Sequence, residues 1–384
     1  MQKEKLLMTP GPTNVPYRVR EAMSRPMIHH RTKEFEYYFT KVNESLKKVF
    51  QTSNHVLTLA SSGTGGMEAS IVNAFSPGDK VLVANTGVFG DRFVKIATKF
   101  GLDVITMDIP WGMGVNPKEL ETLLDSEDGK NVKGVFVTHN ETSTGVANDI
   151  QSVGEILKNR DCLYIVDAIS SLGGLEVKTD EWGIDIVIAG SQKALMLPPG
   201  LAFVSVSEKA WKQIEQSKMP KFYFDFLSYR KSLEKNTTPY TPAVSLIIAA
   251  SEALDMILQE GLDKIFLRHK ILSKACKAGV KALGLEFFAK EEYASDLITS
   301  IKAPENIDFE AVRKILNLEY DIMVAGGQQK LKGRIIRIGH MGYIDGFDIL
   351  KTLSALEIAL NKVGYNVSPG TALSAAQNVL SFNI

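Results

Sequence analysis

Short apolar segments alternate with helical segments between about residues 30 and 205, and this alternation constrains the fold more than any other feature. In residues 35–49, apolar side chains recur at the spacing of one helix face, and a strand-like run at 56–60 follows. Further strand-like runs lie at 80–84, 103–107, 132–138, 162–166, 184–189 and 201–206, with helical patterns at 65–75, 90–100, 117–124 and 149–159. Apolar strands separated by helices predict an α/β fold with a mainly parallel sheet sandwiched by helices.

The pattern changes after about residue 240. Helical patterns at 243–258, 261–283, 308–317 and 345–363 are now mixed with strand-like runs at 297–302, 320–324 and 334–339. We therefore expect a smaller C-terminal α+β domain (246–384), a large domain (21–245) and an N-terminal segment (1–20) near the active site. Two unrelated α+β pieces are the alternative.

Composition excludes several classes of protein. The 44 basic and 44 acidic residues cancel, whereas nucleic-acid binders and proteins of anionic membrane surfaces usually carry a basic excess. No run reaches the roughly 18 apolar residues of a membrane span, and the start lacks the pattern of a signal peptide. Cys162 and Cys276 cannot form a disulfide framework. We expect a cytoplasmic protein with no nucleic-acid or membrane partner.

Ligands of open parallel sheets bind beyond the carboxyl ends of the strands, where loops and helix N-termini converge. That rule selects residues 61–66, 85–90, 139–145, 167–174 and 190–200 as candidate site segments.

Ser62, Gly63 and Thr64 lie in a turn between a strand and a helix. Small residues let the backbone approach an anion, and the helix N-terminus offers free N–H groups. The turn lacks the lysine of a nucleotide-binding loop and the spacing of a dinucleotide fingerprint, so it favours a small phosphate group. A purely structural turn is the alternative.

Asp167 and Lys193 each follow an apolar strand. A carboxylate at a buried strand end needs a compensating cation or donor, which can be a protonated ring nitrogen or simply a turn that it caps. A desolvated lysine amine forms Schiff bases with carbonyls, although many such lysines are surface charges. Together with the phosphate turn, the two residues are the parts that a pyridoxal 5′-phosphate site requires.

The sequence resembles the class V aminotransferases, which are pyridoxal-phosphate enzymes of fold type I, and within them the serine–pyruvate / alanine–glyoxylate aminotransferase group. The resemblance runs from Thr9-Pro10-Gly11-Pro12-Thr13 to Arg337-Ile338-Gly339. Its most specific segments are THNETSTG at 138–145, VDAISSLGG at 166–174 and GSQKA at 190–194.

The resemblance implies a role for each matching residue. Lys193 corresponds to the lysine that carries the cofactor covalently and shuttles a proton, and Asp167 to the partner of the ring nitrogen. The residues that correspond to further cofactor contacts are Ser62, Gly63, Thr64 and Gln192 on the phosphate, Thr142 on the ring 3-oxygen, and Phe89 over the ring face. Many relatives carry Trp at the position of Phe89, and ordinary core packing is its alternative role.

The resemblance also implies substrate and subunit contacts. Arg337 corresponds to the residue that grips the substrate α-carboxylate, for which a planar guanidinium is well suited. Gly11 places its backbone beside the substrate. Thr238 and Tyr240, in the loop 237–242, reach the cofactor phosphate of a neighbouring subunit, which implies a homodimer with shared active sites.

His29, His30 and Arg31 form a segment of open role. Two adjacent histidines suggest a metal, but no third ligand stands at a metal-like spacing, so we expect no metal site. The resemblance places this loop at the mouth of the active site, where it would tune side-chain choice; a structural role is the alternative.

We expect a transaminase that moves the amino group of serine, alanine or aspartate to a 2-oxo acid such as glyoxylate or pyruvate, in two half-reactions of a ping-pong mechanism. A lyase related to cysteine desulfurases is one alternative, but it needs a reactive thiol, and neither cysteine fits. A non-catalytic subunit that retained the fold is the other. The sequence does not fix the amino donor.

Overall fold

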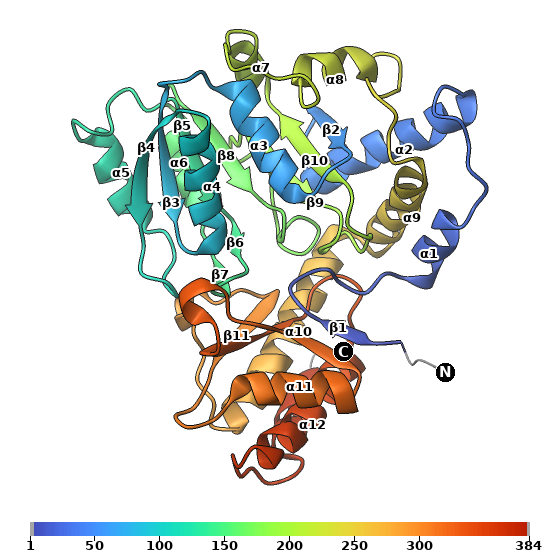
Figure 1. Ribbon diagram of the computed structural model, residues 1–384, viewed down its shortest axis with the longest axis vertical. Helices are drawn as coiled ribbons and strands as arrows, with labels where there is room; N and C mark the ends of the chain where they lie inside the picture. The colour runs from blue at the N-terminus through green and yellow to red at the C-terminus, as the bar shows by residue number, and fades with distance from the viewer. Residues whose placement is uncertain (1–3, 382–384) are drawn as a thin grey trace.

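The computed structural model describes residues 4–381, which contain a seven-stranded and a four-stranded sheet, each with its own helices, and a two-stranded sheet. The larger sheet occupies the upper part of Figure 1 and the smaller sheet the lower part, and α10 (Leu262–Ala282) runs from one to the other. The first three residues of the expected segment 1–20 and the last three of the expected domain 246–384 lie outside the described residues.

The larger sheet has seven strands in the order β2-β10-β9-β8-β5-β3-β4. Its strands are β2 (His55–Leu59), β3 (Lys80–Asn85), β4 (Asp103–Asp108), β5 (Gly134–Thr138), β8 (Leu163–Asp167), β9 (Ile186–Gly190) and β10 (Ala202–Val206). All pairings are parallel except the two made by β10, which runs antiparallel to both of its neighbours. The predicted mainly parallel sheet is therefore confirmed.

Both faces of this sheet are covered because its buried side chains alternate between two cores. On β3, Val81 and Val83 belong to one core, and Leu82 and Ala84 belong to the other. The first core is closed by α3 (Gly63–Ala74), α4 (Val88–Lys99), α7 (Glu208–Ile214) and α8 (Phe226–Leu233). The second is closed by α1 (Tyr17–Met23), α2 (Lys33–Phe50), α5 (Pro117–Asp125), α6 (Ile150–Leu157) and α9 (Val244–Glu260).

The smaller sheet has four strands in the order β1-β12-β13-β11. They are β1 (Leu6–Met8), β11 (Ile298–Lys302), β12 (Ile322–Gly326) and β13 (Ile335–Gly339), and the third core joins them to α10, α11 (Phe309–Glu319), α12 (Gly346–Lys362) and α13 (Thr371–Ser381). Short elements complete the chain: β6 (Asn140–Glu141) pairs with β7 (Val146–Ala147), and 3₁₀ turns cover Glu291–Tyr293 and Gln329–Leu331.

Two segments contribute to a different unit from the one expected. Leu6–Met8 pairs in parallel with β12, so the N-terminal segment also supplies a strand of the smaller sheet. Helix α9 falls within the expected domain 246–384, but its buried side chains belong to the core of the larger sheet. On α10, Ile265 belongs to that same core, whereas the side chains from Leu272 onward belong to the third core. We therefore propose a boundary on α10.

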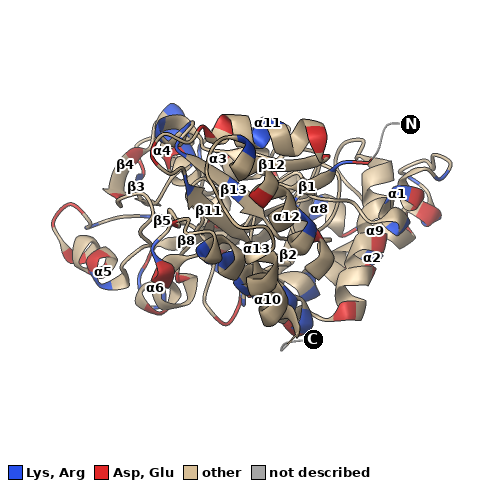
Figure 2. Ribbon diagram, turned by 90° about the horizontal axis from the view of Figure 1, so that it is seen from below, with Lys and Arg blue, Asp and Glu red and all other residues tan. Residues whose placement is uncertain are grey.

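The surface charges are mixed in sign. Figure 2 shows Lys and Arg interspersed with Asp and Glu on the outer helices, while the strands between them are largely free of either. Among the described residues, no helix has the length and apolar character needed to cross a membrane.

Candidate active site

The carboxyl ends of β5, β8 and β9 meet at one edge of the larger sheet. Thr138 and Asp167 pair in register at the ends of β5 and β8, and Asp167 pairs with Ile188 on β9. The turn after β9 carries Lys193 and is held closed because the Ser191 hydroxyl donates to the Pro198 carbonyl at 2.7 Å. Asp167 and Lys193, which the rule on strand ends selected, therefore follow neighbouring strands of the sheet.

Lys193 lies against the N-terminal segment. Its Nζ donates to the carbonyl oxygen of Pro10 at 2.8 Å, and its own carbonyl accepts from the Thr13 hydroxyl at 2.8 Å. Gly11 is forced by this close approach, because a Cβ there would lie 2.5 Å from the lysine Nζ. Its φ of 136° is also one that other residues rarely adopt.

Burial lowers the pKa of Lys193 from 10.5 to about 8. The nearby Asp167 opposes that shift, whereas the positive charges of Arg337 and Arg92 add to it. About a tenth of the amine is therefore uncharged at pH 7, far more than for a lysine with a pKa of 10.5, and a nucleophilic lysine requires the uncharged form.

Asp167 is 3% exposed, and one of its oxygens accepts a hydrogen bond from the Ile169 backbone N–H at 2.8 Å. Burial raises the pKa of Asp167 from 3.8 to about 7; Glu141 adds to that shift, and Lys193 and Arg92 oppose it. A buried carboxylate so poorly compensated gains most from a further cation placed beside it. This is the environment expected for the partner of a protonated ring nitrogen.

The predicted phosphate turn lies at the start of α3. Ser62 precedes the helix in extended conformation and does not cap it with its own side chain. A Cβ on Gly63 would lie 2.6 Å from Cδ1 of Ile169, so the turn packs directly against the segment that follows Asp167. Gln192 lies close by, and its Oε1 is buried without a hydrogen-bond partner. Buried polar atoms are rarely left unpaired, so this oxygen points to a missing partner.

Phe89 lies in the first turn of α4 and remains partly exposed, outside the hydrophobic cores. Its backbone N–H donates to Glu141 Oε2 at 2.9 Å, and that of Gly90 donates to the same oxygen at 3.2 Å. Burial raises the pKa of Glu141, and these hydrogen bonds oppose the shift. A buried acid thus fixes the helix start that presents Phe89. Sequence reasoning quoted Glu141 within a motif but gave it no role.

Arg92 is a second residue that sequence reasoning missed. Its Nη1 donates to the Thr64 hydroxyl at 2.9 Å, and its guanidinium carbon lies 4.7 Å from the centre of the Phe89 ring. The signal available in the sequence was a cation three residues after an aromatic on one helix, a spacing that brings two side chains together.

Arg337 lies on β13 and is 5% exposed. Its guanidinium donates to the Gly326 carbonyl from Nε at 2.9 Å and from Nη2 at 2.7 Å, and to the Thr142 carbonyl from Nη1 at 2.7 Å. Burial lowers the pKa of Arg337 to about 10, and Glu141 opposes that shift. The ion pairs of the described residues include none between Arg337 and a carboxylate. A carboxylate ligand would therefore find an arginine that is buried, oriented and bonded only to neutral oxygens.

Thr238, Tyr240 and Arg31 lie together. Arg31 Nη1 donates to the Thr237 hydroxyl at 2.6 Å and to the Thr238 carbonyl at 2.8 Å. The Tyr240 ring stacks on Tyr223 with 5.2 Å between ring centres. Within residues 4–381, the Thr238 hydroxyl donates to the Tyr240 carbonyl and the Tyr240 hydroxyl to the Phe222 carbonyl, and neither side chain hydrogen-bonds to residues 62–64.

His29 and His30 stack on each other with 4.6 Å between ring centres. Burial and the neighbouring Arg31 lower the pKa of His30. Among residues 4–381, no group of three or more His, Cys, Asp or Glu side chains is arranged to hold a metal ion.

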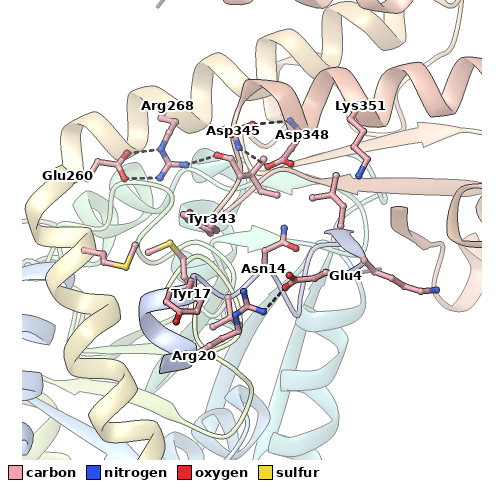
Figure 3. Close-up of a pocket in the computed structure, with 16 residues that line it drawn as sticks. Glu4, Asn14, Tyr17, Arg20, Glu260, Arg268, Tyr343, Asp345, Asp348 and Lys351 are labelled. Atoms are coloured by element: carbon pink, nitrogen blue, oxygen red, sulfur yellow. Dashed lines mark hydrogen bonds and ion pairs between the residues drawn. The ribbon is translucent and has the colours of Figure 1, made fainter. Parts of the chain in front are cut away.

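A cavity of about 660 Å³ lies elsewhere, between the N-terminal segment, α9, α10 and the start of α12 (Figure 3). Its wall includes Tyr17, Arg20, Arg268, Tyr343 and Lys351. None of Lys193, Asp167, Arg337 or residues 62–64 lines it. The cavity is therefore separate from the predicted site.

Comparison with known proteins gives a consistent set of similarities. Residues 7–340 match the family model described as aminotransferase class-V. A soluble hydrogenase small subunit of Synechococcus sp. (strain PCC 6716) is 46% identical over 99% of this chain and 100% of its own length. The L-aspartate–glyoxylate aminotransferase of Paracoccus denitrificans is 37% identical over 98% of this chain and 96% of its own.

A solved structure extends the likeness to three dimensions. The crystal structure of ureidoglycine–glyoxylate aminotransferase from Bacillus subtilis superimposes with a TM-score of 0.95 at 32% identity, covering 99% of each chain. The similarity thus spans both sheets and is not confined to the motifs.

Proposed function

This chain belongs to the class-V aminotransferase family, and we propose that it uses pyridoxal 5′-phosphate to transfer the amino group of serine, alanine or aspartate to a 2-oxo acid such as glyoxylate or pyruvate. The observation that carries the proposal is the pairing of Lys193 and Asp167 on adjacent strand ends, with the pKa of each moved toward 7 by burial. Such opposed shifts on neighbouring strand ends are typical of a site built for proton transfer.

The residues present fit this cofactor at three points. The helix N-terminus at Gly63 offers N–H groups to a phosphate, and the unpaired Gln192 Oε1 lies beside it, able to turn its amide so that the NH₂ donates. Asp167 is short of a cation, which a protonated ring nitrogen supplies. The Lys193 amine, with its lowered pKa, can form an imine with the aldehyde of the cofactor.

Lys193 has two tasks. Bound pyridoxal phosphate supplies an aldehyde that takes up the amino group and a ring that withdraws electrons from the donor's α-carbon. Lys193 would hold the cofactor through its Nζ, and the same Nζ would accept the proton of the donor's α-carbon. The contact with the Pro10 carbonyl holds the Lys193 amine as a hydrogen-bond donor.

Asp167 and Phe89 set the electronics and the plane of the site. The carboxylate of Asp167 keeps the ring nitrogen protonated, since burial makes an unpaired negative charge there costly. Phe89 provides a flat face at the start of α4, and Glu141 fixes its backbone from behind. The Thr142 hydroxyl remains the proposed contact of the ring 3-oxygen.

Arg337 orients the donor. A substrate carboxylate would replace the carbonyl oxygens of Gly326 and Thr142 as acceptor, because it adds a negative charge opposite the guanidinium and two oxygens that match its planar fork. The fork fixes the α-carbon relative to Lys193, and the Gly11 backbone lies beside both. This geometry recognises any α-amino acid and leaves the side chain to be read elsewhere.

A homodimer with shared sites is part of the proposal. Phe222 is 79% exposed and lies beside Tyr223 and Tyr240, which forms an apolar surface next to Thr238. Exposed aromatic clusters of this kind are typical of interfaces. Arg31 holds the same loop, so it would act on a neighbouring subunit's site through Thr237 and Thr238. A cytoplasmic location is supported by the two unpaired thiols, which suit a reducing compartment.

The two alternatives lack support from the site. A desulfurase needs a reactive thiol, but burial raises the pKa of Cys162 and raises that of Cys276 to about 11. A non-catalytic relative has no need to retain Lys193, Asp167 and Arg337 in working positions.

Two measurements test the proposal. The purified protein should take up pyridoxal phosphate and develop the absorbance of a protonated imine, and it should convert at least one of serine, alanine and aspartate with glyoxylate, pyruvate or 2-oxoglutarate. Initial rates at several concentrations of both substrates should give the parallel lines of a ping-pong mechanism. A colourless protein that binds no cofactor would support the non-catalytic role, and sulfide released from cysteine would support the lyase.

A further inference from the structure

Arg92 joins the phosphate turn to the aromatic ring of the site. Its guanidinium donates to Thr64, in the first turn of α3, and covers Phe89, in the first turn of α4. The two contacts come from one side chain, so Arg92 fixes the distance between the part of the site that holds a phosphate and the part that holds a ring.

Arg92 is also a cation without an anion. Its neighbours on α4, Asp91 and Lys95, pair with each other at 2.6 Å, and the ion pairs of residues 4–381 include none made by Arg92. The side chain is only partly exposed. A partly buried guanidinium that holds a neutral hydroxyl retains most of its capacity to bind an anion.

The phosphate turn lacks charge of its own. Helix α3 contributes N–H groups and about half a positive charge at its start, and its first turn contains no basic residue. A phosphate monoester carries close to two negative charges at neutral pH. In the described part of the chain, the charged side chain that hydrogen-bonds to residues 62–64 is Arg92.

We propose that Arg92 is the counter-charge of the cofactor phosphate and the residue that aligns Thr64 with Phe89. The inference rests on the proposed use of pyridoxal phosphate. The positive charge of Arg92 also lowers the pKa of Asp167 and of Lys193, which agrees with a guanidinium directed toward the interior of the site. Arg92 is thus a positioning residue that makes the protein prefer the phosphorylated form of the cofactor.

The test compares two ligands that differ by the phosphate alone. The apoprotein is titrated with pyridoxal phosphate and with pyridoxal, and the ratio of the two Kd values measures the phosphate preference. Arg92→Gln should lower this ratio about tenfold or more, because the lost interaction is a hydrogen bond and a charge on an anion. Its Kd for pyridoxal should change less than about twofold.

Lys95→Gln is the matched control. It removes the same charge from the same helix one turn away, where the side chain is 67% exposed and pairs with Asp91. The phosphate preference of this variant should stay within about twofold of the wild type, because an exposed charge is screened by salt. Thermal unfolding of the apo forms shows whether each variant is folded.

Each remaining outcome overturns the inference. An unchanged ratio in Arg92→Gln shows that the phosphate is held without Arg92. Equal weakening of both ligands shows that Arg92 acts on the ring through Phe89 alone. Loss of activity toward aspartate but not alanine, with normal cofactor binding, assigns Arg92 to the substrate side chain. If Arg92→Gln does not fold, Arg92→Met takes its place, since it also removes the charge, and an unchanged ratio in that variant overturns the inference.

The proposed function fails separately. A wild-type protein that binds neither pyridoxal phosphate nor pyridoxal contradicts the cofactor itself. A wild-type protein that binds both, with a preference that Arg92→Gln leaves intact, contradicts the role of Arg92 alone.

Discussion

Two regions of this molecule bring charged residues together, the cavity of Figure 3 and the predicted site at the strand ends, and they differ in how those charges are paired. In the cavity of Figure 3, Arg268 makes a two-pronged ion pair with Glu260, at 2.6 and 3.1 Å, and Arg20 pairs with Glu4 at 2.8 Å. In the site at the strand ends, Arg337 bonds only to carbonyl oxygens, and Asp167 accepts a single backbone hydrogen bond.

The difference supports the proposal that the region around Lys193, and not the cavity, carries the chemistry. A ligand that binds Arg268 or Arg20 in the cavity of Figure 3 must compete with the carboxylates that already pair with them. A ligand entering the Lys193 site supplies what is missing there: a carboxylate for Arg337, a cation for Asp167 and a partner for Gln192. Buried charged and polar groups that lack partners therefore point to the Lys193 site, although the cavity of Figure 3 has the volume to hold a ligand.

The largest expected effect tests this distinction with one lysine from each region. Lys193→Ala should lower turnover by more than about a thousandfold and abolish imine absorbance, because covalent attachment and proton transfer share one amine. Lys351→Ala, in the wall of the cavity, should leave turnover within about twofold. Turnover of both variants is measured with whichever of serine, alanine and aspartate the wild type converts fastest, and absorbance spectra report the imine. Near-normal turnover in Lys193→Ala would rule out the proposed mechanism.

Asp167→Asn should have the next largest effect. The amide retains an acceptor for the Ile169 N–H but cannot hold a ring nitrogen protonated, so kcat should fall about a hundredfold or more. The free energy of unfolding of the apo form should not decrease, because a poorly compensated buried charge is removed. Denaturant titration measures this second quantity. Parallel losses of activity and stability would favour the turn-capping role.

The pair of arginines gives the most direct version of the comparison. Arg337→Gln should raise the KM of the amino donor by about thirtyfold or more, since it removes a charge-assisted grip on the carboxylate. Arg268→Gln should leave that KM within about twofold and lower the free energy of unfolding instead, by about 1 kcal/mol, because its bonds to Glu260, Gly342 and Ile344 are structural. Steady-state kinetics and denaturant titration of both variants separate the two roles. A raised KM in both Arg337→Gln and Arg268→Gln would contradict the assignment of substrate binding to Arg337 and of a structural role to Arg268.

Much of the fold was predictable because its signal is local. Apolar runs and helical periodicity in the printed sequence located the strands of the larger sheet and most helices to within a few residues. Leu6–Met8 could not be predicted as a strand, because three residues carry no period and their partner, Ile322–Val324, is more than 300 residues away. Helix α13 was missed for a similar reason: it is defined by packing on α10, where Gly279 lets Ala372 approach closely.

In the candidate site, too, some residues could be selected from local sequence and others could not. Lys193 and Asp167 follow apolar strands, so the rule on strand ends found them without a structure. Glu141 and Arg92 could not be given roles, since what matters is that one reaches the start of α4 and the other reaches Thr64. Their importance is a property of contacts between elements and leaves no mark on spacing.

The smallest expected effect concerns pH and again contrasts Lys193 with an ordinary lysine. Capture of pyridoxal phosphate by the apoprotein requires the neutral amine, and the folded pKa of about 8 lies below the free value of 10.5. The rate should therefore rise about tenfold between pH 7 and pH 9 and level off above the midpoint near 8. Stopped-flow absorbance measures it. Burial is the main cause of the low pKa, and Arg337 contributes, so Arg337→Gln should move the midpoint upward. A rate that keeps rising toward pH 10.5 would show that Lys193 is solvated like the lysines of the outer surface and would remove the physical basis of the comparison.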